Sequence, residues 1–313
     1  MSCGSMGDLA RLLIEPGASP HVFDANSEAT MFLYEDLGSD RKFGGLQGIA
    51  GTRAQYSDRI VPLSYVPVGA LALQPGADAI DKWMPRILGG TKSGNNIDPA
   101  ETLPSFGYLI DRVGGVFQYD DCIVGKTVIR GRSGPGEGEP EIIDMVVWIF
   151  ARVERTPQDP SPPTWPGTAP AIPSGALHVP YAYHQGVFTL NGNVRTFDEF
   201  VLTIDNMVQP RNRNSLTPTC FLLGSRQTFL QLRGPFTASS FSDAFSFYST
   251  GYAASIALTA GTISCTFQFP HLRNMLRVPR VPGKREIPQV MNFQATRTSA
   301  TPYEIRVVND SVV

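Results

Sequence analysis

Proline and glycine recur along the whole chain, and short stretches with apolar residues at alternate positions lie between them. The 313 residues include 30 glycines and 26 prolines. Because these residues end helices and favour turns, the composition excludes a helical bundle. Alternating stretches such as residues 60–66, 103–111 and 262–269 are typical of half-buried strands. We therefore expect a mainly β fold full of turns and loops.

Two segments depart from the strand pattern. Between residues 77 and 88 apolar side chains recur every three or four positions, which predicts a helix that ends at Gly89. This segment contains Pro85, which we expect to kink or split it. Residues 239–247 predict a second short helix, with Phe241, Ala244 and Phe245 on one face.

A proline-rich segment at residues 156–177 divides the chain. Dense proline favours extended backbone and prevents regular strand pairing, so we expect a stiff linker or a crossover along a sheet edge here. The chain then divides into an N-terminal arm (1–20), a first β module (21–155) and a second β module (178–313). In the arm, Leu9, Leu12 and Leu13 share one face of a predicted helical turn, which we expect to contact another subunit.

One short pattern occurs in both predicted modules. Residues 106–111 read FGYLID and residues 200–205 read FVLTID, so both carry Phe-x-x-x-Ile-Asp. The match favours duplication of one module, with these two strands at equivalent positions. Asp111 and Asp205 could be paired catalytic acids, but an Asp after a strand more often accepts hydrogen bonds from the next backbone amides. We interpret both as turn residues.

Two charged segments are further candidates for contacts between subunits. Residues 122–130 and 141–153 predict a long hairpin with an acidic tip at residues 132–141, and residues 273–285 form a basic connection. The predicted contact residues, including those of the arm, are Leu9, Leu12, Leu13, Arg132, Glu137, Glu139, Glu141, Arg273, Arg277 and Arg280.

The residue patterns do not point to an enzyme, a cofactor site or a metal site. The loop GGTKSGNN lacks the order of a phosphate-binding loop, and the acidic tip lacks the spacing of a calcium loop. His178 and His184 lie six residues apart without a third ligand nearby, and the four widely spaced cysteines are interpreted as free thiols. A net charge of -2 gives no reason to expect tight DNA binding. The N-terminus does not have a signal-peptide pattern, and we expect no membrane span.

The order of several motifs resembles one known family. These motifs are GIAGTRAQYSDRI, a Trp-bearing helix ending in ILGG, TLPSFGYLIDR, VFTLNG, FVLTIDNMVQP, MNFQATRT and YEIRVVND. Together, over about residues 20 to 309, they resemble the tail tube proteins of long-tailed bacteriophages. The resemblance implies a mainly β fold, a β-sandwich or barrel with a short flanking helix, possibly duplicated. Its modules would form rings of six that stack into a hollow tube for the genome. Two modules per chain would give three chains per ring, whereas one module with an added outer domain would give six.

The resemblance implies a structural, non-enzymatic subunit of the virion tail, assembled in the host bacterial cytoplasm. Its expected partners are other copies of itself, a tail terminator and tail tip proteins, with viral DNA passing through the lumen without specific binding. Acidic side chains in the lumen would repel DNA and let it slide. The alternative is a carbohydrate- or surface-binding decoration protein, in which exposed Trp165, Tyr181 and Tyr183 would stack on a ligand.

Overall fold

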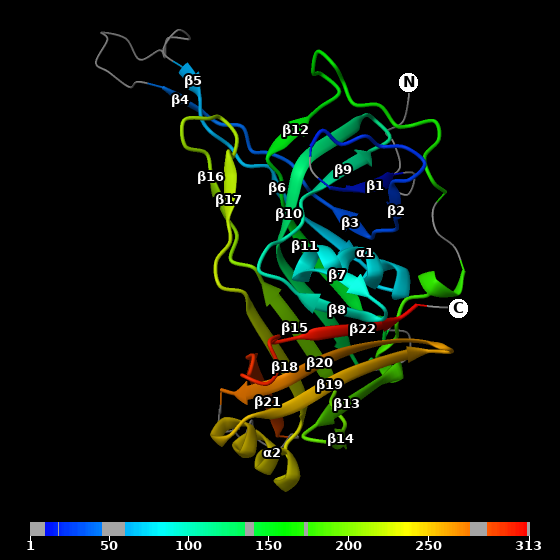
Figure 1. Cartoon of the computed structure of the whole chain (residues 1–313), viewed down its shortest axis with the longest axis vertical. Coiled ribbons are helices and arrows are strands. Elements are labelled where there is room, and N and C mark those ends of the chain that lie inside the picture. Colours follow the sequence, from blue (N-terminus) through cyan, green and yellow to red (C-terminus); the bar gives the residue numbers. More distant parts are fainter. Residues whose placement is uncertain are drawn as a thin grey trace.

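The computed structural model describes residues 10–17, 19–45, 60–134, 141–171, 175–275 and 287–311. The fold is mainly β, and the paired strands are antiparallel and curl around one core as a barrel with further strands attached (Figure 1).

The first half of the chain contains helix α1 and the strands β1 to β12. Its elements are β1 (Arg11–Pro16), β2 (Glu28–Thr30), β3 (Tyr34–Glu35), β4 (Phe43–Gly45), β5 (Ile60–Pro62), β6 (Val68–Leu73), α1 (Ala77–Leu88), β7 (Gly89–Ser93), β8 (Asn96–Pro99), β9 (Phe106–Asp111), β10 (Val116–Arg132), β11 (Asp144–Phe150) and β12 (Val153–Arg155).

The second half begins with two short 3-10 turns, η3 (Ala176–His178) and η4 (Tyr183–Gln185), that follow the proline-rich segment. Its other elements are β13 (Gly186–Leu190), β14 (Asn193–Arg195), β15 (Glu199–Asp205), β16 (Gln209–Arg211), β17 (Cys220–Leu222), β18 (Gln227–Pro235), α2 (Ala238–Ser249), β19 (Tyr252–Ala260), β20 (Ile263–Asn274), β21 (Pro288–Ala295) and β22 (Arg306–Asp310).

The order of strand pairings is repeated in the two halves. In the first half the pairs are β1–β2, β1–β9, β3–β6, β6–β11, β9–β10, β10–β11 and β10–β12. In the second half the corresponding pairs are β13–β14, β13–β19, β15–β18, β18–β21, β19–β20, β20–β21 and β20–β22. The hairpin β4–β5 follows β3 as the hairpin β16–β17 follows β15. Helix α1 follows β6 as helix α2 follows β18. The β7–β8 hairpin is an addition of the first half. The fold is therefore an internal repeat.

This repeat does not use the Phe-x-x-x-Ile-Asp match. That pattern lies on β9 and β15, whereas the repeat places β9 with β19 and β3 with β15. The prediction that these two strands hold equivalent positions is wrong. The match reflects a shared local turn, because the amide of Val113 donates to Asp111 (2.9 Å) and the amide of Met207 donates to Asp205 (2.8 Å). Both donating residues, Val113 and Met207, have positive φ.

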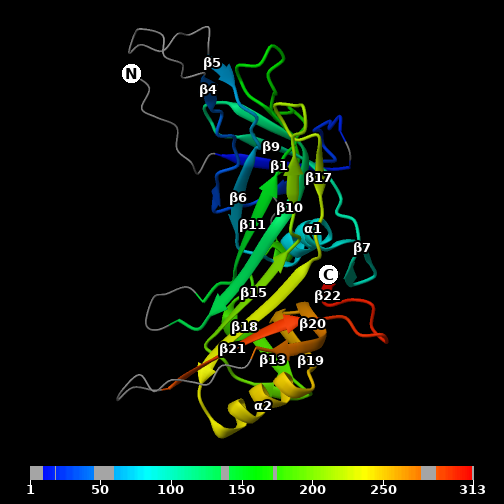
Figure 2. The same cartoon turned by 90° about the vertical axis from the view of Figure 1, so that its left-hand side faces the viewer.

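The two halves share one sheet and one core. Strands β3, β6, β11, β10, β15 and β18 are consecutive neighbours, so the first half supplies four of these six strands, and β21 extends the row beyond β18 (Figure 2). A second link joins β22 to β8. One hydrophobic cluster runs from Leu12 to Val307 and contains residues of both halves. The predicted domain boundary at residues 156–177 stays a prediction.

Helix α1 forms as its spacing predicts. Ile80, Trp83 and Ile87 are fully buried, and Trp83 packs edge-on against Phe106 of β9, with ring centroids 6.0 Å apart. Gly89 ends the helix in a left-handed conformation (φ 93°), which glycine adopts at little cost. The helix runs through Pro85 without being split.

Helix α2 forms at the end of the molecule opposite the hairpin of β4 and β5 (Figure 1). The Thr237 side chain caps it by accepting a hydrogen bond from the Ser240 amide (3.1 Å). The helix is as predicted, but its buried face is not, because Ala244 and Phe247 are buried whereas Phe245 is 54% exposed.

The predicted N-terminal arm does not contain a helical turn within the described residues. Leu12 and Leu13 instead belong to β1, which pairs with β2 on one edge and with β9 on the other. Both leucines are buried within the chain. The helical prediction failed because β1 packs on both of its faces, so that consecutive rather than alternate residues are apolar.

Candidate assembly site

Two hairpins project side by side from one end of the molecule (Figure 1). They are β4–β5 and β16–β17, and we call them the twin hairpins. The amide of Tyr65, just after β5, donates to the carbonyl of Leu216 in the second hairpin (2.8 Å). The Asn212 side chain donates to the carbonyl of Tyr65 (3.1 Å). These bonds hold the twin hairpins together.

Large apolar side chains are exposed on the twin hairpins and on the residues beside them. They are Phe43, Val61, Leu63, Leu216, Leu222 and Leu223. Phe43 is the most exposed, at 71%. A two-stranded hairpin is at best marginally stable in water, and contiguous exposed apolar side chains mark contact surfaces. The twin hairpins are therefore the strongest candidate for a contact with another molecule.

A groove lies at the base of the second hairpin. It has a volume of about 460 Å³ and is lined in part by Trp148, Phe150 and Met207. Lys126 also lines it, with its ammonium 5.7 Å from the centre of the Trp148 ring. The exposed apolar surface thus continues from the hairpins onto the sheet.

Below the hairpins, Asn206 joins the two halves of the chain. Its amide donates to the carbonyl of Gly125 in β10 (2.8 Å). Its side-chain nitrogen donates to the carbonyls of Ile87 in α1 (3.0 Å) and Val124 in β10 (3.1 Å). Because Asn206 is 3% exposed, these bonds are shielded from water. One residue of the second half therefore binds both a helix end and a strand of the first half.

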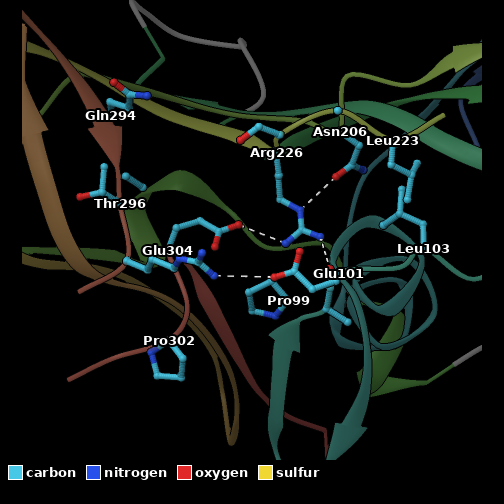
Figure 3. Close-up of a pocket in the computed structure, with 15 residues that line it drawn as sticks. Pro99, Glu101, Leu103, Asn206, Leu223, Arg226, Gln294, Thr296, Pro302 and Glu304 are labelled. Atoms are coloured by element: carbon cyan, nitrogen blue, oxygen red, sulfur yellow. Dashed lines mark hydrogen bonds and ion pairs between the residues drawn. The ribbon is translucent and has the colours of Figure 1, made fainter. Parts of the chain in front are cut away.

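Arg226 extends this junction into a cleft of about 380 Å³ (Figure 3). Its guanidinium donates to the side-chain oxygen of Asn206 (3.0 Å), to Glu304 (3.1 Å) and to the carbonyls of Leu88 (2.9 Å) and Ala100 (2.7 Å). A cation at the C-terminal end of a helix is favourable, because the last carbonyls there lack partners within the helix. The arrangement binds four segments together and leaves the guanidinium well supplied with acceptors.

The predicted acidic and basic contact residues have mixed outcomes. Arg132 lies exposed at the end of β10, and Arg273 lies exposed on β20. Glu141 accepts a hydrogen bond from the amide of Gly134 (3.2 Å), and it lies 3.4 Å from His184. Five other predicted contact residues lie outside the described residues, so their roles stay predictions. They are Leu9, Glu137, Glu139, Arg277 and Arg280.

The reason for predicting Leu12 and Leu13 as contact residues does not hold. They were predicted as contact residues because their segment had no partner within the chain, and β1 supplies that partner. The structure does not bring the predicted arm, acidic tip and basic connection into one site among the residues that it describes.

Two of the three aromatic side chains that a decoration protein would use to stack on a ligand are buried. Tyr181 is 1% exposed and Tyr183 is 6% exposed, so the expectation that both are exposed is wrong. The Tyr183 hydroxyl donates to the carbonyl of Phe197 (2.6 Å), and its ring stacks on Phe200. Trp165 is half-buried, with the guanidinium of Arg11 4.4 Å from the centre of its ring.

Residues considered for metal binding or redox chemistry have structural contacts. His178 lies 3.3 Å from Asp78, and the described residues contain no group of three or more His, Cys, Asp or Glu side chains arranged to hold a metal ion. Cys122 and Cys265 are free and fully buried, and burial raises the pKa of both thiols. Within the described part of the chain, no helix is both long and apolar enough to span a membrane.

Sequence reasoning missed the twin hairpins and the Arg226 contacts. The hairpins have short strands, and β16 contains a proline, so their periodicity is weak. Asn206 was present in the motif FVLTIDNMVQP, but its contacts depend on α1, which lies far away in the sequence. No local pattern marks Arg226.

The fold defines a mainly β protein built as an internal repeat, with exposed apolar hairpins. Neither a scan against protein-family models nor a search of curated proteins found a match to this chain.

Proposed function

We propose that this chain is a structural subunit that assembles into rings, which stack as the tail tube of a bacteriophage. The observation that carries the proposal is the way in which the two repeats are joined. Strand β10 of the first repeat pairs with β15 of the second, and these strands are not equivalent in the repeat. The contact is therefore head to tail, and a head-to-tail contact can be used again by the next copy.

The exposed apolar surface supports assembly by a second route. The twin hairpins extend beyond the shared core and carry Phe43, Val61 and Leu222 on their surface. Burying apolar side chains at a contact gains about 25 cal/mol per Å² of area removed from water. Because the hairpins lie at one end of the molecule, they suit contacts between stacked rings.

In this proposal, the tube is a conduit for viral DNA and the chain is not an enzyme. The net charge of -2 suits a passage that does not hold DNA tightly. A tail terminator and tail tip proteins would bind its two ends, and the assembled protein would be found in the virion tail.

Electron microscopy of the purified protein tests the proposal. Rings or tubes of about ten nanometres across are expected from the size of comparable closed assemblies. Analytical ultracentrifugation over a range of protein concentrations provides an independent measure of assembly. A protein that stays monomeric at every concentration, and binds glycans instead, would contradict the tail-tube proposal and support the decoration protein.

A further inference from the structure

The repeat gives α2 the place in the second half that α1 has in the first. Each helix has 12 residues, and the sixth residue of each contacts the equivalent outer strand. In α1, Lys82 donates to the carbonyl of Ala29 in β2 (2.9 Å). In α2, Asp243 accepts a hydrogen bond from Arg195 of β14 (2.5 Å). The two helices therefore have the same orientation on their own repeats, and their residues can be compared position by position.

Helix α1 is also covered from its other side, by the second half of the chain. It lies against β20, β22 and η3. The Asn309 side chain of β22 donates to the carboxylate of Asp81 (2.7 Å), and Asn206 donates to the carbonyl of Ile87 (3.0 Å). Both Met84 and Ile87 are fully buried.

Helix α2 exposes an aromatic stripe at the corresponding positions. Phe245 and Tyr248 are 54% and 55% exposed, and their ring centroids lie 6.5 Å apart. They hold the eighth and eleventh positions of the helix, as Met84 and Ile87 do in α1. Phe241, one turn earlier, is half-buried. We call Phe241, Phe245 and Tyr248 the α2 stripe, and contiguous exposed apolar side chains of this kind mark contact surfaces.

The repeat specifies which surface would cover the α2 stripe. Strands β20 and β22, which lie against α1, correspond to β10 and β12 of the first half. Helix α2 and strand β12 lie toward opposite ends of the molecule, so one copy does not bring them together (Figure 1). The equivalent cover can therefore come only from the first half of a second copy.

The first half offers a complementary surface at residues 112–118 and 153–155, which we call the β10–β12 end. Val113 is 39% exposed there, and Phe117 is half-buried with the Arg112 guanidinium 4.5 Å from its ring centre. Arg155 is exposed at the end of β12. The last turn of α2, which the structure describes in full, carries no basic residue. Cations are favourable both beside aromatic rings and at the C-terminal end of a helix.

We infer that the α2 stripe of one copy packs against the β10–β12 end of the next copy, as α1 packs against β20 and β22 within the chain. The inference rests on the proposed ring assembly and specifies a contact within a ring. Each copy offers its α2 stripe to one neighbour and its β10–β12 end to the other, so the contact repeats until the ring closes.

A full-length double variant, Phe245→Ser/Tyr248→Ser, tests the role of the α2 stripe. Sedimentation should show association weakened by about a hundredfold or more, because two large aromatic side chains are lost from the contact. The melting temperature of the monomer should change little, since both side chains are exposed there. The matched control is Phe245→Leu/Tyr248→Phe, which keeps the stripe apolar and should associate within about threefold of the wild type.

A photo-cross-link tests the partner surface. Tyr248 is replaced by p-benzoylphenylalanine, and isotope-labelled and unlabelled copies are mixed so that links between copies can be recognised by mass spectrometry. The expected products join position 248 of one copy to residues 112–118 or 153–155 of another.

The outcomes separate this contact from the proposed function. Rings that form equally well with the serine variant, or that cross-link position 248 to other segments, would overturn the α2 contact and leave the proposed function intact. A wild-type protein that forms no rings would overturn both.

Discussion

Replacing Asn206 by alanine tests whether this residue fastens the two halves of the chain together. The variant loses two hydrogen bonds donated by the side chain, to Ile87 and Val124, and one accepted from Arg226. At about 1 kcal/mol for each bond, the loss is about 3 kcal/mol. Ile87 lies in the last turn of α1, where its carbonyl lacks a partner within the helix. Leaving that carbonyl buried and unpaired adds about 1 kcal/mol or more.

The assay is urea unfolding followed by circular dichroism, with the free energy of unfolding compared at equal slope. Asn212→Ala is the matched control. Asn212 also donates two hydrogen bonds, to Tyr65 and Leu216, but it lies on the twin hairpins outside the core. We expect Asn206→Ala to lose about 3 to 4 kcal/mol and Asn212→Ala to lose about 1 kcal/mol or less. Equal losses for the two variants would refute the argument that burial makes the Asn206 bonds decisive.

Three further results are expected. Val61→Asp on the twin hairpins should prevent tube formation seen by electron microscopy, whereas Val194→Asp at a similarly exposed valine on β14 should not; neither should change the melting temperature much, because both side chains are exposed in the monomer. Leu13→Ala should lower the free energy of unfolding in urea by about 2 to 5 kcal/mol, since Leu13 is fully buried in β1, and a loss under 1 kcal/mol would contradict that placement. Burial raises the pKa of Glu35 more than its pairing with Arg112 lowers it, so stability should fall as the pH rises from about 4.5 through the folded pKa. A series of melts should show this slope in the wild type and a smaller slope in Glu35→Gln.

The sequence predicted those elements whose pattern is local. Helix α1 and strand β20 follow from the spacing of apolar residues, and the turn before β20 contains Gly261, which has a positive φ of 66°. The turn roles of Asp111 and Asp205 were also predictable, because an Asp side chain binds the amide two residues later in the chain. These features depend on residues close together in the sequence.

Features that depend on distant residues were not predictable. The strand β1 looked like a helical turn because three consecutive apolar residues satisfy either pattern, and only pairing with β9, about a hundred residues later, decides between them. The repeat itself was suspected from a six-residue match at positions that do not correspond. Its true basis is the order of pairings, which joins strands that are distant in the sequence, such as β6 with β11 and β18 with β21, and which no local pattern displays.

The shared core gives a physical reason for keeping two repeats in one chain. A contact between separate molecules must overcome the loss of translational and rotational freedom, whereas the β10–β15 contact forms within a single chain at a high effective concentration. That contact is further stabilised by the buried hydrogen bonds that Asn206 donates to Ile87 and Val124. The contact inside the chain should therefore be permanent, and in the proposed ring the corresponding contact between copies should be weaker and depend on protein concentration. In the proposed assembly, such a subunit would fold alone first, and the twin hairpins would then add contacts that the monomer does not use.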